Sequence, residues 1–93
     1  MNSIEKIIAD RLFQLTPDSE KLEINAYVDD SGYSFEFFAV KNGVKSQCYD
    51  MIDNGLIPEK AFDDAVQEIA TLVRQNPDYE AGKVNKFRFD ATK

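Results

Sequence analysis

Carboxylates are the side chains of this sequence best suited to acid–base or metal chemistry, because its 93 residues include 17 Asp and Glu but no histidine. Three pairs lie close together along the chain: Asp29 with Asp30, Asp50 with Asp53, and Asp63 with Asp64. Two carboxylates in different environments can share the acid and base roles of a hydrolysis. Each pair also falls where Asp is common for structural reasons, namely a turn, a loop and the first turns of a helix. The structural interpretation is therefore preferred.

Other catalytic and cofactor-binding patterns are absent from the sequence. Without histidine there is no Ser–His or Cys–His nucleophile pair and no His-ligated metal site. The single cysteine, Cys48, cannot form an internal disulfide and is expected to face the core as a small apolar side chain. The segment DMIDNG lacks the alternating oxygen ligands of a calcium loop, and the four glycines are too dispersed for a phosphate loop. The sequence predicts a protein that is not an enzyme and needs no cofactor.

The net charge of −6 is concentrated in the middle of the chain. Residues 29–68 carry nine acids and three bases, residues 1–28 carry five and three, and residues 69–93 carry three and five. This distribution disfavours direct nucleic-acid binding, which needs clustered Lys and Arg; it is typical of a protein with a basic partner or of simple solubility. No apolar run approaches the roughly 18 residues of a membrane span. The first residues also lack the apolar stretch of a signal peptide, so no membrane contact and a cytoplasmic location are expected.

Two helices are expected from the spacing of the apolar residues. A helix is expected over residues 4–15, and Asn2 and Glu5 at its start have the spacing of a capping box. A second helix over residues 58–75 has Pro58 at its first helical position. The apolar stripe of the second helix consists of Phe62, Ala65, Val66, Ile69, Leu72 and Val73.

Four strands are expected from alternating apolar residues, over residues 21–28, 33–40, 44–49 and 83–90. The last strand turns Phe87 and Phe89 inward and Lys86 and Arg88 outward. The element order is therefore α-β-β-β-α-β. We expect a single α+β domain over residues 1–93, in which an antiparallel meander plus a C-terminal strand carries both helices on one face, giving two layers.

The turns determine which residues face one another across the meander. Asn42-Gly43 predicts a type I′ turn, so that Phe38 lies opposite Gln47 and the pairing continues to Glu36 and Tyr49. The earlier turn must contain an even number of residues if the apolar sides of both strands are to share a face. A two-residue Ser31-Gly32 turn and a four-residue loop both satisfy this condition.

Adjacent Phe37 and Phe38 must point to opposite faces of the sheet, so one of them leaves the core. With the two-residue turn, the rows of the outer face are Tyr27–Glu36–Tyr49, Asn25–Phe38–Gln47 and Glu23–Val40–Lys45. Aromatic side chains among polar ones are typical of the centre of a protein interface. Cross-strand aromatic pairs can also stabilise a sheet without a partner, and the face could pair two copies in a homodimer. All three interpretations remain open at this point.

The element order and its sequence segments resemble the YezG-like immunity proteins, which are antitoxin partners of bacterial polymorphic toxins. The resemblance is carried by INAYVDDSG, YSFEFFAV, YDM, PEKAFDDAVQEIATLVRQ and KFRFD, and it extends over nearly the whole chain. It implies a cognate toxin domain, commonly a nuclease, that this protein binds and neutralises. The chain lacks the tryptophan often found near the last strand of that family and has a shorter tail than many of its members.

The expected partner-binding residues come from the charge and register patterns rather than from the family. The steering carboxylates are Asp29, Asp30, Asp50, Asp53, Asp63 and Asp64, and the sheet-face residues are Tyr27, Glu36, Phe38 and Tyr49. The carboxylates would steer a basic toxin and the aromatic side chains would anchor it. The alternative function is a small homo-oligomeric accessory or regulatory module that pairs through the same face.

Overall fold

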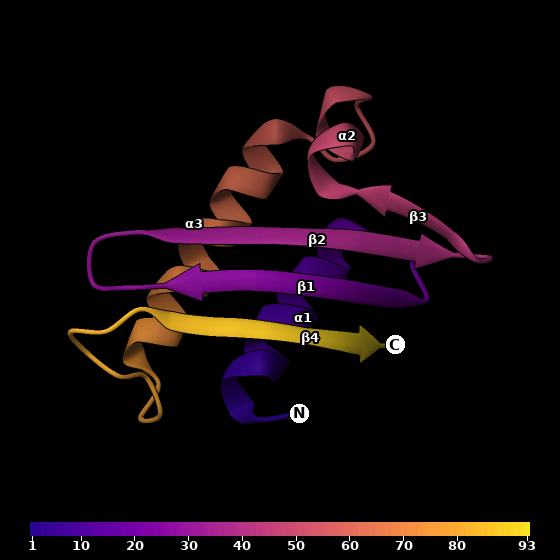
Figure 1. Ribbon diagram of the computed structural model, residues 1–93. Coiled ribbons are helices and arrows are strands. Elements are labelled where there is room, and N and C mark those ends of the chain that lie inside the picture. Colours follow the sequence, from indigo (N-terminus) through magenta and orange to yellow (C-terminus); the bar gives the residue numbers. More distant parts are fainter.

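The computed structural model describes residues 1–93 and contains one four-stranded sheet with helices on one of its faces (Figure 1). Its elements are α1 (Ser3–Leu15), β1 (Lys21–Val28), β2 (Tyr33–Lys41), β3 (Val44–Gln47), α2 (Cys48–Asp53), α3 (Glu59–Gln75) and β4 (Asn85–Thr92). The strands lie in the order β3-β2-β1-β4, and each neighbouring pair is antiparallel. The α+β class and the order of the predicted elements are confirmed, and α2 is an addition to them.

The helix α1 begins at the predicted capping box. The Asn2 side chain accepts a hydrogen bond of 2.8 Å from the Glu5 amide, and the Glu5 carboxylate accepts one of 3.1 Å from the Asn2 amide. These two bonds satisfy amides that the helix itself leaves unpaired. The helix ends at Leu15, ahead of Pro17, because the residue before a proline is disfavoured in helical geometry.

The loop between β1 and β2 contains four residues rather than two. Val28 lies opposite Tyr33, and Glu23 therefore lies opposite Phe38. The predicted parity of the register is confirmed, but the predicted rows of the outer face are wrong by two positions along β1. The wider loop is held by the Asp29 carboxylate, which accepts hydrogen bonds from the amides of Ser31 and Gly32 at 2.9 and 2.6 Å.

The turn between β2 and β3 has the predicted form, but β3 is shorter than predicted. Asn42 and Gly43 both have positive φ, at 52° and 76°, and Phe38 lies opposite Gln47. The ladder stops there because the Gln47 side chain accepts a hydrogen bond of 2.7 Å from the Tyr49 amide and caps the helix α2. The predicted pairing of Glu36 with Tyr49 is therefore wrong.

The second predicted helix forms with a small difference at its start and ends at Gln75 as predicted. It begins at Glu59, so Pro58 is the N-cap rather than the first helical residue. Five of the six residues of the predicted stripe are buried, whereas Leu72 is 37% exposed and Ala70 is buried instead. The chain reverses before it at Gly55, whose φ of 78° is readily accessible only to glycine.

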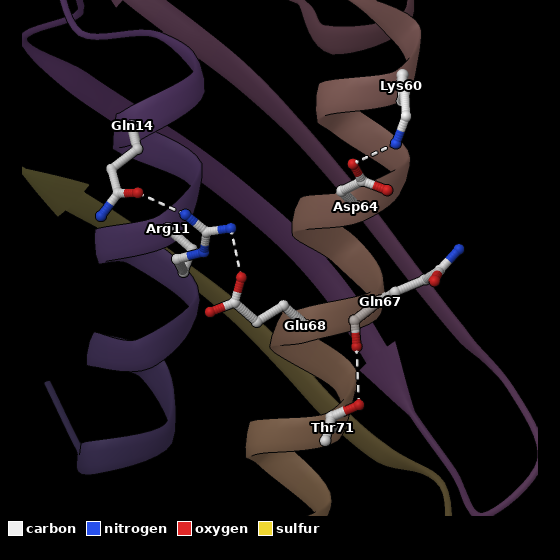
Figure 2. A network of polar contacts seen from close by, with 7 residues as sticks. All are labelled: Arg11, Gln14, Lys60, Asp64, Gln67, Glu68 and Thr71. Carbon is white, nitrogen blue, oxygen red and sulfur yellow. Dashed lines mark hydrogen bonds and ion pairs between the residues drawn. The ribbon is translucent and has the colours of Figure 1, made fainter.

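Both α1 and α3 lie behind the sheet, and the opposite face is free of other elements (Figure 1). Phe37 points into the core with 1% exposure, and Cys48 is fully buried as predicted. Burial raises the pKa of the Cys48 thiol, so it remains protonated and unreactive at neutral pH. On the solvent side of the helices, Arg11 of α1 donates to Glu68 of α3 at 2.6 Å and to Gln14 (Figure 2). No helix of the structure is long and apolar enough to cross a membrane.

Candidate functional site

The outer face of the sheet carries two exposed aromatic side chains. Tyr27 is 39% exposed and Phe38 is 43% exposed, while the neighbouring Phe37 is buried. Tyr27 lies opposite Ser34, and Phe38 lies opposite Glu23. The two aromatic residues are therefore four positions apart along β1, which is about 13 Å along a strand. The outer face brings these aromatic residues onto one side of the protein but does not place them in one cluster.

The position of β4 changes the charge of this face. The strand β4 lies beside β1, so Lys86 is opposite Tyr27 and Arg88 is opposite Asn25. The face also carries Lys21, Lys45, Glu23, Glu36 and Asp90, so it is mixed rather than acidic. A hollow of about 570 Å³ on this face is lined by Glu36, Phe38 and Arg88, among others. It brings together only two of the predicted partner-binding residues.

A second hollow, between α2 and the start of α3, brings three predicted residues together. It has a volume of about 230 Å³, and its lining residues are Tyr49, Ile52, Asp53, Glu59, Phe62 and Asp63. Tyr49 is 41% exposed and packs edge-on against the Phe62 ring, with 5.9 Å between the ring centroids. Glu59, Ile52 and Phe62 were not predicted as site residues. The sequence signal that could have indicated this hollow is Gln47, whose spacing before Asp50 is compatible with the cap of a helix starting at Cys48.

The carboxylates around this hollow have no cation partners. Ten of the 17 acidic side chains form a hydrogen bond or an ion pair within the protein. The other seven are Asp18, Glu36, Asp50, Asp53, Glu59, Asp63 and Asp78. Five of these seven lie on α2, on the first turns of α3 or on β2 near Tyr49. We call Glu36, Tyr49, Asp50, Asp53, Glu59 and Asp63 the acidic patch.

Tyr49 is the aromatic residue of the acidic patch. Its pKa is raised, first by partial burial and then by the negative charge that Cys48 and Glu36 would contribute. The phenol therefore stays protonated at neutral pH and can donate a hydrogen bond. A ring that is half-buried and surrounded by unpaired carboxylates can contact an apolar or cationic group of a partner.

Three of the remaining predicted carboxylates already have partners within the protein. Asp29 binds the amides of its own loop, and Asp30 accepts hydrogen bonds of 2.5 Å from the Tyr79 hydroxyl and 2.9 Å from the Gly82 amide. Asp64 forms an ion pair of 2.9 Å with Lys60 (Figure 2). The loop acids lie at the end of the sheet and hold the segment before β4. The structure gives Asp29 and Asp30 a structural role and separates them from the acidic patch.

Acidification is expected to remove the stabilisation that the loop carboxylates provide. Hydrogen bonds from backbone amides lower the pKa of Asp29, and those from Tyr79 and Gly82 lower that of Asp30, from the ordinary value of 3.8. A lowered pKa in the folded state means that stabilisation is present above about pH 4 and is lost as the pH falls through the lowered values. The Tm of the wild type and of the Asp29→Asn/Asp30→Asn variant should therefore differ most near neutral pH and converge in acid. A difference that is the same at all pH values would contradict this role.

The acidic side chains do not form a metal site, since no group of three or more His, Cys, Asp and Glu is arranged to hold an ion. No protein-family model matches the sequence, and no curated protein matches it significantly.

Proposed function

We propose that this protein is an immunity protein of the YezG-like type, which binds and neutralises a cognate toxin domain with a basic surface. The observation that carries the proposal is the acidic patch, where Asp53, Glu59 and Asp63 line one hollow with the half-exposed ring of Tyr49 and form no ion pair within the protein. It acts by binding rather than by catalysis, in the cytoplasm of the producing bacterium. The toxin domain is expected to be a nuclease.

The charge of the acidic patch is suited to attracting such a toxin. Residues 49–64 carry five acids and one base, a large part of the whole net charge of −6. A nuclease needs clustered cations to bind its phosphate substrate. A protein that presents opposite charge on a small area can steer toward those cations and cover them. Asp64 is paired with Lys60, whereas Asp50, Asp53, Glu59 and Asp63 form no ion pair within the protein and can interact with a partner.

The shape of the acidic patch provides an anchor as well as charge. Binding energy at protein interfaces is concentrated in a few residues, among which Tyr is over-represented, and these sit inside a polar rim. Tyr49 lies on Phe62 in the hollow, and carboxylates stand around it. This arrangement supports α2 and the start of α3, rather than the centre of the sheet, as the primary contact with the toxin.

The proposal is tested by capture followed by rescue of growth. The tagged protein is incubated with lysate of its source bacterium at low and high salt, and captured proteins are identified by mass spectrometry. The captured domain is then expressed in a laboratory host with and without this protein. We expect a basic domain that arrests growth alone and is harmless when the protein is co-expressed. A captured domain whose toxicity persists, or capture of nothing but further copies of this chain, would overturn the immunity function.

A further inference from the structure

The two edges of the sheet differ in how they end. On one side β3 has only four residues and passes directly into α2. On the other side β4 has eight residues, contains no proline and pairs with β1 without a bulge over its whole length. A long, regular edge strand is a template for pairing with another chain unless it is shortened, bulged, covered or protected by charged side chains, especially Lys. The edge of β4 has only the last of these protections, in Lys86, Arg88 and Asp90, and such charges oppose a strand of like charge but not one of complementary charge.

The register shows which backbone groups of β4 face this free edge. The Asp29 amide donates to the Gly32 carbonyl at 3.0 Å, so odd residues of β1 bond to β2 and even residues bond to β4. The bond of 3.1 Å from the Lys93 amide to the Glu20 carbonyl has the same phase. Hydrogen-bonded and non-hydrogen-bonded pairs alternate along an antiparallel ladder. The residues at even positions, Lys86, Arg88, Asp90 and Thr92, therefore turn their amides and carbonyls away from β1. These are also the residues whose side chains lie on the outer face.

A space beside β4 is suited to the inward side chains of an added strand. A hollow of about 640 Å³ lies between α1 and the end of β4; Ala9, Phe13 and Ala91 form its apolar part, and Lys6, Asp10 and Lys93 lie at its polar part. The Lys93 ammonium lies 5.8 Å from the centroid of the Phe13 ring. Figure 1 shows that α1 passes behind β4 and that its first turns extend beyond it. The helical layer is thus wider than the sheet on this side. A fifth strand next to β4 would lie beneath α1, with apolar side chains directed into the hollow.

The charges on β4 define the outward side chains of such a strand. Lys86 and Arg88 form no ion pair within the protein, and Asp90 pairs only with the exposed Lys21 at 3.3 Å. Directly opposite side chains of opposite charge stabilise a strand pair, and like charges destabilise it. The complementary segment has acidic residues opposite Lys86 and Arg88 and a basic residue opposite Asp90. We propose that the edge of β4, together with the hollow beneath α1, binds an extended segment of another protein with this alternation as a fifth antiparallel strand.

The edge of β4 is less suited to a second copy of this chain than to an extended segment of another protein. Pairing two β4 strands about a two-fold axis would place both α1 helices on the same side of the joined sheet. Each α1 extends beyond its own β4 in Figure 1, so the two helices would compete for one space. Several registers would also oppose Lys86 or Arg88 with another cation. The edge lies on the side of the sheet away from α2, so this inference does not depend on the immunity function.

The inference is tested with the capped, fluorescently labelled peptide Thr-Leu-Lys-Val-Glu-Val-Glu, whose residues in this order would face Thr92 to Lys86. Binding to the full chain is measured by fluorescence anisotropy. Methylating the backbone nitrogens of the two Glu residues removes donors to β4 and should weaken binding at least tenfold. Methylating those of the two Val residues, which point away from β4, is the matched control and should change binding by less than about threefold. Absence of binding, or equal effects of both methylations, would overturn the proposal.

A charge exchange tests the register of the added strand. Arg88→Glu should weaken binding of the same peptide roughly tenfold, because one attraction is replaced by a repulsion. A peptide with Lys in place of the Glu opposite position 88 should regain affinity for Arg88→Glu and lose it for the wild type. Failure of this exchange in a variant with unchanged circular dichroism would overturn the assigned pairing. A protein dimer that the peptide dissociates in sedimentation experiments would show that the occupant is a second copy instead.

Discussion

Replacing Phe37 by alanine should lower the free energy of unfolding by about 3–5 kcal/mol, whereas the same replacement at Phe38 should lower it by less than about 1 kcal/mol. The two residues are neighbours in β2 and have the same side chain. Phe37 is 1% exposed and contacts the helical layer, so its removal leaves a cavity that the surrounding core cannot fill. Phe38 is 43% exposed on the outer face and loses only contacts with its cross-strand neighbours.

Urea unfolding followed by circular dichroism measures both changes. Because small domains have only about 5–15 kcal/mol of stability, a loss of this size brings Phe37→Ala close to its unfolding transition at room temperature. Phe37→Leu serves as a milder variant and should still be less stable than Phe38→Leu. Equal losses at the two positions would contradict the assignment of Phe37 to the core and Phe38 to the surface.

Tyr49→Ala should weaken binding of the toxin captured by this protein roughly fivefold to a thousandfold, which corresponds to about 1–4 kcal/mol. Tyr49 is the aromatic side chain in the hollow between α2 and α3, and truncation would remove its packing and its hydroxyl together. Tyr49→Phe keeps the ring and should weaken binding less than Tyr49→Ala does. Surface plasmon resonance with the purified toxin domain provides the affinities.

The acidic patch makes a separate prediction about the rate of association. Asp53→Asn/Asp63→Asn should lower the association rate and reduce its dependence on salt, because the carboxylates steer a basic partner over distance. Tyr27→Ala is the matched control for Tyr49→Ala, since the two tyrosines are exposed to a similar extent. Tyr27 lies near the end of β1, opposite Lys86 of β4 and away from the acidic patch. A large effect of Tyr27→Ala with none of Tyr49→Ala would move the contact to the outer face of the sheet. The immunity function would survive that result, but the acidic patch would not be its site.

The sequence by itself determined those features that depend on a few neighbouring residues. Asn2 and Glu5 specify the start of α1 because the two capping bonds span only three residues. Asn42 and Gly43 specify the tight turn after β2 because both tolerate positive φ. The alternation of apolar residues determined that Phe37 and Phe38 face opposite ways, whatever the rest of the fold does.

Only the tertiary structure decided how these pieces meet. The parity of the register allowed loops of two or four residues, and the bonds that Asp29 makes to Ser31 and Gly32 selected four. The competition between a longer β3 and the helix α2 was decided by the Gln47 cap. Neither choice is visible in apolar periodicity, because each depends on which partner a single polar side chain takes.

For the candidate site, too, the sequence determined some features and the tertiary structure decided the others. Sequence composition indicated that the middle of the chain is acidic, but it could not distinguish carboxylates with partners from those without. The fold gives Asp30 a bond to Tyr79, which is 49 residues away, and leaves Asp53 and Asp63 without partners beside Tyr49. It also places β4 next to β1, which brings Arg88 to the outer face and makes it mixed in charge. Long-range pairing decides electrostatic context, since charges that are distant in the chain interact only once the fold has brought them together.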